Sequence, residues 1–387
     1  MKKIIVFYNF KGSAETEWLL PIFEYLKKDY LVFTIFKNYK AYLSLKQNKT
    51  NFKIWKNISK SYYIEKKSDN FIFKILIYIF NNFLRNEQIV NLLRKNIYSL
   101  SSIKKIIKKK VNFKNFQLSY FFSEFGFSSG WVDYLEKTKN IKIIHYPSTP
   151  QIYLNEVKKK YSLRGDLLFL NSFLDKKVFQ KKIQKNKIFI SGNPKYDPKW
   201  LNKYYKKEDT KDKIIIAYVS RFDYVNNNYK KLLEKQLIEL IEILNLLNRE
   251  VVFKLHPTKN SQQYKIFLKK YAKFKWVESS KNLVELCQNC LCLITHPFSA
   301  AGFDAIMTSR PILQLWPITE REKKKLTSYE KLKLINVSNS KKNFKNKIQN
   351  IIKEKKISHS NSKVFFPARK NTINRILYQL KKIEIKN

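Results

Sequence analysis

Glycine, histidine, cysteine and acidic residues are all scarce in this sequence of 387 residues. It contains 6 Gly, 4 His and 3 Cys, and only 30 Asp and Glu residues in all. No GxGxxG or P-loop spacing can be built from these glycines, which excludes the dinucleotide oxidoreductases and the P-loop enzymes. No Asp-x-Asp pair follows an expected strand, so we predict no obligatory metal ion and no separate cofactor.

The three cysteines, Cys287, Cys290 and Cys292, lie close together in the sequence. Cys-x-x-Cys spacing occurs in zinc and redox sites, but no second pair of ligands accompanies it. Small residues packed in a core are therefore the favoured interpretation. The absence of an even disulfide framework indicates a reducing compartment, and we expect a cytoplasmic protein.

Positive charge dominates the chain, because 78 Lys and Arg residues give it a formal net charge of +48. Only nine of these are Arg, and a uniform excess of Lys, Asn and Ile is what an AT-rich genome produces. Dedicated nucleic-acid readers rely more on Arg, so we expect no specific nucleic-acid partner. A basic nucleic-acid-binding protein stays an alternative on charge alone. The charge also favours phosphorylated ligands and anionic membranes.

Apolar, β-branched runs alternate with helical stretches along the whole chain, which indicates parallel sheets with crossover helices. Strands are expected at 3–8, 31–36, 51–55, 118–122, 141–145, 167–170, 187–191, 213–219, 250–255, 274–277, 291–295 and 311–315. The lysine-rich stretch 199–213 has the composition of an interdomain connection. We predict an α/β fold with two Rossmann-like domains facing a cleft, over 1–200 and 201–370, followed by a C-terminal helix at 371–387.

Polar residues follow two of the expected strands in the second half. His256 and Pro257 come after strand 250–255, and Thr295, His296 and Ser299 come at the end of strand 291–295, just before a helix. Ligands of open α/β sheets bind at such strand ends, and a helix start attracts anions. The pattern predicts a phosphate ester or diphosphate held between His256 and Ser299.

Three motifs resemble those of GT-B glycosyltransferases that use CMP- or CDP-activated donors, such as bacterial sialyltransferases, polysialyltransferases and CDP-glycerol glycerophosphotransferases. They are His256-Pro257, the Thr295-x-x-x-Ser299 loop with Arg310-Pro311 after it, and the turn Gly192-Asn193-Pro194. The likeness extends over about 120–320. The sequence departs from the family at Phe298-Ser299-Ala300, where many relatives have paired serines, and at His145-Tyr146, where glycerophosphotransferases have His-Gly.

The resemblance implies a glycosyltransferase, or a glycerophosphotransferase, with a nucleotide-activated donor that is cytidine-linked. The acceptor would be an oligosaccharide or a lipid-linked glycan, as in capsule or lipopolysaccharide biosynthesis. Residues 1–200 would bind the acceptor and 201–370 the donor. A UDP-GlcNAc 2-epimerase-like enzyme of the same fold is an alternative. Such enzymes line the sugar site with acidic residues, which the motifs here lack.

His256 is the leading candidate to stabilise the departing phosphate, although a turn histidine that caps the next helix is the simpler interpretation. The other candidates have alternatives of the same kind. Ser299 is interpreted alternatively as an N-cap, Arg221 as a member of a surface ion pair, and Asp304 as a partner of the helix dipole. The predicted donor-binding residues are Ser220, Arg221, His256, Pro257, Thr295, His296, Ser299, Ala300 and Asp304.

The base that accepts the proton of the acceptor is expected in the first half of the chain. Glu124, in a loop 123–126 after a strong strand, is the first choice, and His145 is the second. A lone Glu in a loop is more often merely solvated. Lys11, Gly12 and Ser13, after the first strand, are predicted to lie on the acceptor side.

The segment 71–80 is apolar apart from Lys74, and five lysines follow at 104, 105 and 108–110. It is too short to span a bilayer. The sequence favours a buried crossover helix, but an amphipathic segment lying in a membrane interface is the alternative. Because an enzyme of lipid-linked glycans would benefit from docking, we predict peripheral association with the inner face of a membrane.

Overall fold

A computed structural model of the chain divides into two compact units. Unit 1 comprises Met1–Thr149, Val157–Asp197 and Pro367–Asn387, and unit 2 comprises Pro150–Glu156 and Pro198–Phe366. The final helix therefore belongs to unit 1. The structure describes residues 2–59, 61–65, 71–111, 115–125, 130–136, 140–148, 165–179, 187–205, 213–218, 227–247, 249–255, 261–279, 281–297, 299, 301–324, 335–354 and 371–385.

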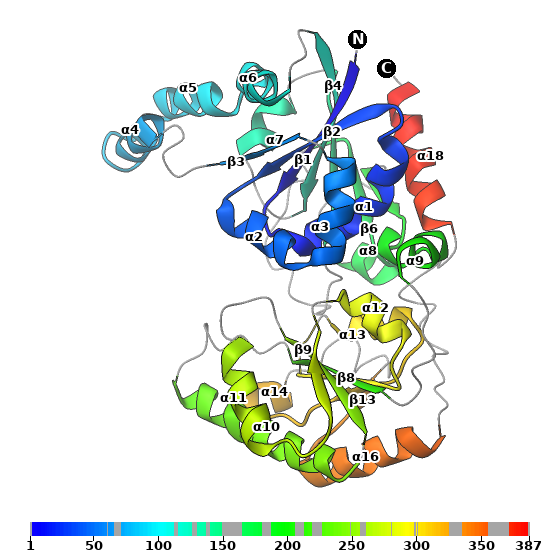
Figure 1. Cartoon of the computed structure of the whole chain (residues 1–387). Helices are drawn as coiled ribbons and strands as arrows, with labels where there is room; N and C mark the ends of the chain where they lie inside the picture. The colour runs from blue at the N-terminus through cyan, green and yellow to red at the C-terminus, as the bar shows by residue number, and fades with distance from the viewer. Residues whose placement is uncertain are drawn as a thin grey trace. The chain divides into compact units, whose positions relative to one another are not determined.

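Unit 1 is built on a seven-stranded sheet in the order β3-β2-β1-β4-β5-β6-β7, with all neighbouring strands parallel (Figure 1). Its strands are β1 (Lys2–Asn9), β2 (Tyr30–Phe36), β3 (Ser61–Ile64), β4 (Phe116–Glu124), β5 (Lys142–Tyr146), β6 (Leu167–Leu170) and β7 (Ile188–Ile190). The central strands are buried on both faces, as parallel strands covered by helices require. Ile4, Ile5 and Val6 of β1 are fully buried.

Helices connect these strands and cover the sheet. They are α1 (Ser13–Leu26), α2 (Tyr39–Gln47), α3 (Lys49–Ile58), α4 (Phe71–Asn82), α5 (Glu87–Tyr98), α6 (Leu100–Lys110), α7 (Gly130–Leu135), α8 (Phe173–Phe179), the 3₁₀ turn η2 (Pro194–Tyr196) and α18 (Thr372–Ile385). The last of these closes the unit: Arg375 donates from Nη2 to the carbonyl of Ile190 at 2.7 Å, and Ile376 is fully buried.

Unit 2 is built on a six-stranded parallel sheet in the order β10-β9-β8-β11-β12-β13. Its strands are β8 (Lys213–Tyr218), β9 (Glu250–Leu255), β10 (Trp276–Glu278), β11 (Leu293–Thr295), β12 (Ile312–Gln314) and β13 (Asn336–Val337). Its helices are α9 (Pro198–Tyr204), α10 (Asn227–Asn245), α11 (Ser261–Tyr271), α12 (Leu283–Gln288), α13 (Gly302–Met307), α14 (Glu320–Lys324) and α16 (Lys341–Glu354).

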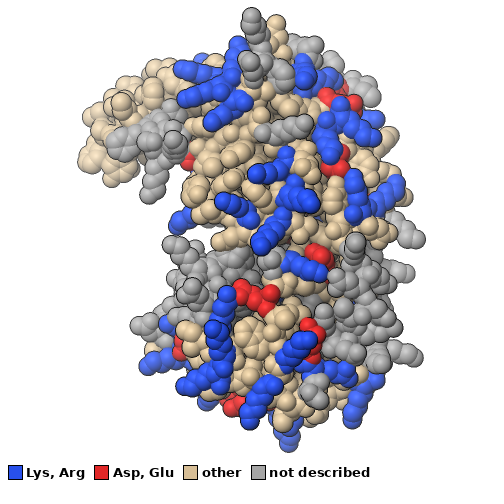
Figure 2. All heavy atoms as spheres, in the orientation of Figure 1, with Lys and Arg blue, Asp and Glu red and all other residues tan. Residues whose placement is uncertain are grey.

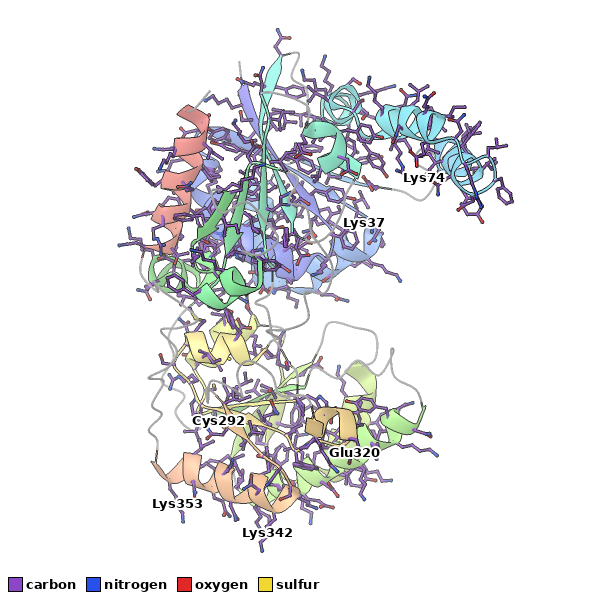
Figure 3. All side chains as sticks on the ribbon, turned by 180° about the vertical axis from the view of Figure 1, so that it is seen from behind. Lys37, Lys74, Cys292, Glu320, Lys342 and Lys353 are labelled. Carbon is purple, nitrogen blue, oxygen red and sulfur yellow. The ribbon has the colours of Figure 1, made fainter. Side chains whose placement is uncertain are left out.

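The cysteines belong to the core of unit 2. All three are buried free thiols, and Cys292 packs with apolar side chains such as Leu240 and Ile294 (Figure 3). The expectation that they fill the core is confirmed.

One sequence prediction of secondary structure is wrong. The expected strand 51–55 lies within α3, where Asn51, Ile54, Trp55 and Ile58 are buried at helical spacing and Asn48 caps the first turn. A small apolar face and a helix start outweigh the local composition there. The lysine-rich stretch 199–213, expected as an interdomain connection, begins within helix α9, whose Trp200 and Leu201 are buried.

Candidate functional site

The strand order of unit 1 reverses beside β1, because β2 and β3 lie on one side of it and β4 to β7 on the other. Ligands of doubly wound sheets bind at the carboxyl ends of the strands beside such a reversal. β1 and β4 end level with one another, with Tyr8 paired to Ser123. The residues that follow β1 and the last residue of β4 therefore meet at this edge.

The loop after β1 is held by its own side chains. Asn9 donates from Nδ2 to the carbonyl of Gly12 at 3.0 Å and to Oγ1 of Thr16 at 2.8 Å, and it accepts the Gly12 amide at 2.6 Å. Gly12 has φ +93°, and a Cβ there would lie 2.4 Å from the carbonyl oxygen of Ala41. Only glycine fits this turn, and the turn fixes the backbone position of the neighbouring Lys11.

Glu15 lies in the first turn of α1 and is completely buried. Its Oε2 accepts the amides of Phe10 at 2.5 Å and Lys11 at 3.1 Å. The side chain lies on the apolar face of the helix, one turn before the buried Trp18 and Leu19. A carboxylate so placed organises the loop, and its second oxygen is still available for chemistry.

Glu124 is the last residue of β4, so its prediction as a loop residue is wrong, and so is the alternative that it is solvated. Its side chain is only 4 % exposed and forms an ion pair with Nζ of Lys11 at 2.7 Å. Ser148, two residues after β5, donates its hydroxyl to the same oxygen, Oε1. The strand end and the ion pair hold the carboxylate at the sheet edge.

The carboxyl groups of Glu15 and Glu124 form a pair. Oε1 of Glu15 and Oε2 of Glu124 are both buried, and neither receives an N–H or O–H from any other described residue. The pKa of Glu15 is raised well above its ordinary value, first by burial, then by the negative charge of Glu124 and the hydrogen bond between the two carboxyls. Burial and the neighbouring carboxyl therefore favour the protonated form of Glu15.

The two faces of β5 separate Tyr146 from His145. Glu124 is paired with Tyr146 and Ser123 with His145, and successive side chains of a strand point to opposite faces. Tyr146 is fully buried and stacks on Trp18 of α1, with ring centroids 5.0 Å apart. Burial, with Glu15 and Glu124 nearby, raises its pKa.

His145 instead lies on the face of Phe125, whose ring centroid is 6.2 Å from its own. The structure therefore does not bring His145 to the Glu15–Glu124 pair. The other predicted residues of this half do gather: Lys11 contacts Glu124, Gly12 forms the turn, and Ser13 begins α1.

In unit 2, four of the predicted donor-binding residues are described: Thr295, His296, Ser299 and Asp304. Ser220, Arg221, His256, Pro257 and Ala300 lie outside the described residues. Helix α13 begins at Gly302, and its N-cap Ala301 makes no side-chain cap. Ser299 lies two residues before Ala301 and accepts the Ala301 amide at 3.1 Å, so its interpretation as the N-cap residue is wrong.

His296 points into unit 2. Its Nδ1 lies 3.1 Å from the carbonyl oxygen of Pro297, and its Nε2 lies 3.8 Å from Oε1 of Glu322. Tyr229 donates to the same Glu322 oxygen at 2.5 Å. Burial lowers the pKa of His296, and the Glu322 charge opposes that shift without reversing it. A neutral imidazole at neutral pH follows.

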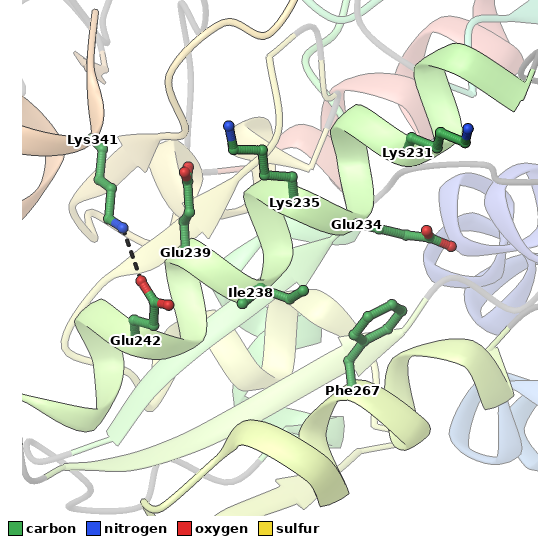
Figure 4. Close-up of a pocket in the computed structure, with 8 residues that line it drawn as sticks. All are labelled: Lys231, Glu234, Lys235, Ile238, Glu239, Glu242, Phe267 and Lys341. Atoms are coloured by element: carbon green, nitrogen blue, oxygen red, sulfur yellow. Dashed lines mark hydrogen bonds and ion pairs between the residues drawn. The ribbon is translucent and has the colours of Figure 1, made fainter.

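A hollow of about 470 Å³ lies on the surface of unit 2, over α10 and α11 (Figure 4). Ile238 and Phe267 contribute apolar surface, and Lys341 pairs with Glu242 across its rim at 2.8 Å. Lysines and glutamates alternate around it, so their charges largely cancel. None of the predicted site residues lines it, and we attach no function to it.

Sequence reasoning missed Glu15, Tyr146 and Ser148. The signal for Glu15 was present, because a charged residue at position 15 shares a helical face with Trp18, Leu19 and Ile22. An acidic residue on such an apolar face is expected to be buried, which makes it a candidate site residue. No comparable signal marks Tyr146 or Ser148, since only the pairing of β4 with β5 places them beside Glu124.

Comparison with known proteins gives a structural likeness alone. No protein-family model matches the sequence, and no curated protein matches it. Among solved structures, the UDP-GlcNAc 2-epimerase of Methanocaldococcus jannaschii is similar with a TM-score of 0.61 at 16 % identity, covering 99 % of this chain and 100 % of that one.

Two further structures show the same likeness. MnaA of S. aureus, solved with UDP, has a TM-score of 0.60 at 14 % identity, covering 98 % of this chain and 96 % of that one. A glycosyltransferase of Rickettsia africae has a TM-score of 0.54 at 16 % identity, covering 100 % of this chain and 99 % of that one. The chain thus has the α/β GT-B fold that UDP-GlcNAc 2-epimerases share with glycosyltransferases.

Proposed function

We propose that this protein is an enzyme acting on a nucleotide sugar, and that the Glu15–Glu124 pair transfers a proton during the reaction. The pair carries the proposal. It lies at the reversal point of the unit 1 sheet, it is buried, and the raised pKa of Glu15 keeps a proton on it where an isolated carboxyl would have lost one.

Epimerisation of a UDP-linked sugar is the reaction we place first. Inverting a ring carbon next to the anomeric centre breaks a C–H bond and forms another on the opposite face, which takes an acid and a base. Glu15 and Glu124 supply two carboxyls of which one is protonated. The scarcity of acidic motifs spoke against an epimerase, and Glu15 removes that objection. The likeness to UDP-GlcNAc 2-epimerases supports the same choice.

Glycosyl transfer is the second candidate, favoured by the ion pair of Glu124 with Lys11. The ion pair holds the carboxylate in place at the sheet edge, where it can take the proton of an acceptor hydroxyl. In either reaction we assign the nucleotide to unit 2, with Thr295, Ser299 and Asp304 as proposed contacts, and the sugar or acceptor to unit 1. A cytidine-linked donor belongs to this second candidate.

The test incubates the protein with UDP-GlcNAc in D₂O and follows the sugar by proton NMR, in parallel with CMP- and CDP-activated donors. Epimerisation incorporates deuterium at the inverted carbon and yields a second sugar. Transfer or hydrolysis releases the nucleotide with no exchange at that carbon. Failure of UDP, CMP and CDP to bind, together with no turnover of any donor, would overturn the proposal.

Glu124→Gln separates the proton-transferring role from substrate binding. We expect turnover to fall by about 10²–10⁴-fold, the usual contribution of a positioned acid or base, while nucleotide affinity stays within a few-fold. Glu24→Gln makes the same substitution elsewhere in unit 1 and is the control, because Glu24 lies near the end of α1 and forms an ion pair with Lys27, three residues on, at 2.8 Å. Turnover of Glu124→Gln within a few-fold of the wild type would refute the assignment.

A further inference from the structure

A helical arm of unit 1, formed by α4 and α5, exposes large apolar side chains to solvent. Figure 1 shows it projecting away from the sheet, with α4 at its far end. No residue of α4 whose exposure is described is buried, although the helix is apolar nearly all round. The buried crossover helix that the sequence favoured here is therefore wrong. The exposed apolar side chains of the arm and its turn are Ile72, Ile75, Tyr78, Ile79, Phe83, Leu84 and Leu92.

The arm and the helix that follows it are strongly basic. Residues 71–110 contain nine Lys and Arg and a single acidic residue, Glu87. Lys74 lies on α4 itself, and Lys108, Lys109 and Lys110 form the last turn of α6 (Figure 3). In Figure 2 blue side chains gather over α6, next to the tan surface of the arm. Apolar and positive surfaces thus adjoin.

The dimensions of α4 suit the surface of a bilayer rather than its interior. Twelve residues extend about 18 Å, against the roughly 30 Å of a hydrocarbon core. None of the helices in the described part of the chain combines the length and hydropathy needed to cross a membrane. An exposed apolar helix beside a basic surface supplies the two contributions that hold a segment at a membrane surface, buried apolar area and attraction to anionic lipids.

We propose that this arm docks on an anionic lipid bilayer, with α4 entering the headgroup region and the lysines of α6 contacting lipid phosphates. Anionic lipids complement the charge of the arm, whereas a second copy of this chain would bring an equally positive arm against it. This docking does not depend on the reaction that the enzyme performs.

The test is co-sedimentation of the full chain with vesicles of phosphatidylcholine alone and of phosphatidylcholine with 30 % phosphatidylglycerol, chosen as about the anionic share that draws polybasic segments. We expect binding to the anionic vesicles and its loss at high salt. Ile72→Asn with Tyr78→Asn should weaken binding by about tenfold or more. The matched control is Ile266→Asn with Tyr378→Asn, since these side chains are 64 % and 69 % exposed, against 71 % and 62 % in the arm.

The lysines are tested in the same way. Replacing Lys108, Lys109 and Lys110 together by Gln should weaken anionic-vesicle binding by about a hundredfold, at roughly tenfold or less per lysine. Replacing the exposed Lys269, Lys270 and Lys273 of unit 2 removes the same charge and should change binding far less. Circular dichroism checks that each variant is folded.

Three results would overturn the proposal. The first is that the wild-type chain does not sediment with anionic vesicles at low salt. The second is that the control variants weaken binding as much as the arm variants do. The third is that the chain does not bind vesicles but is dimeric by light scattering and becomes monomeric when the arm is substituted, which would make the arm an interface between copies. Because no substrate is present, none of these results bears on the proposed reaction.

Discussion

Gly12→Ala is the substitution whose cost can be worked out most directly from the structure. Residue 12 has φ +93° and ψ −113°, a conformation that costs a residue with a side chain about 1–3 kcal/mol. The added Cβ would lie 2.4 Å from the carbonyl oxygen of Ala41 and 2.7 Å from Cβ of Ser44, so backbone must move. Overpacking of this kind adds about 1–3 kcal/mol, for a total of about 2–6 kcal/mol.

Gly302→Ala is the matched control. Its Cβ would meet nothing closer than 3.8 Å, from Ile312, and its φ is ordinary. Because Gly302 begins α13, alanine should be neutral or stabilising by up to about 1 kcal/mol. For units of roughly 200 residues, each kcal/mol shifts the thermal midpoint by about 2–4 °C, so Gly12→Ala should lower it by about 4–24 °C and Gly302→Ala should shift it by no more than about 4 °C.

Differential scanning fluorimetry measures both midpoints, and hydrogen–deuterium exchange locates the loss. We expect faster exchange in peptides of β1 and α1, which the turn connects, and of α2, whose Ala41 and Ser44 lie against Gly12, with unchanged exchange in unit 2. A Gly12→Ala midpoint equal to that of the wild type, or a loss shared equally by the two glycine variants, would refute the reasoning about this turn.

Three more predictions follow from burial and charge. Glu15 binds its proton more tightly in the folded than in the unfolded protein. Its contribution to stability is therefore fully present below the ordinary pKa of 4.5 and is lost as pH rises through the folded pKa, by about 1.4 kcal/mol for each unit by which the pKa is raised. Glu15→Gln should flatten this dependence, which urea denaturation at pH 5 and 8 measures. Ile376→Ala, on the buried face of α18, should lower the free energy of unfolding by about 2–4 kcal/mol. Tyr378→Ala, at a side chain that is 69 % exposed, should change it by less than about 0.5 kcal/mol, and the midpoints of urea denaturation measure the difference. The three buried cysteines should react with iodoacetamide only on unfolding, which mass spectrometry of native and denatured samples detects.

The strands were the most predictable part of this chain. β1, β4 and β9 are long apolar runs, and the alternation of such runs with helices was enough to predict an α/β fold with parallel sheets, as found. The error at 51–55 came from a short run, where strand and helix patterns are hard to tell apart. Burial of Asn51 and Ile58 completes the helical period there, and only the packed structure shows that burial.

The site was less predictable because its residues come from separate parts of the chain: α1 and the loop before it, β4, and β5 with the segment after it. Glu124 was found because it follows a strong strand. Glu15, one helix turn after β1, resembled an ordinary partner of the helix dipole. Its burial and its contact with Glu124 depend on the sheet order, which places β4 directly beside β1 although more than a hundred residues separate them. The same geometry moves His145 to the other face.

The shared proton of Glu15 and Glu124 is the central claim, and infrared spectroscopy of the protein labelled with ¹³C-glutamate tests it most directly. During a pH titration we predict a protonated-carboxyl band that survives well above pH 4.5, the ordinary value for glutamate, and that disappears in Glu15→Gln. Loss of every protonated glutamate band by about pH 5.5 in the wild type, one unit above that value, would contradict the account, because both carboxyls would then be ionised.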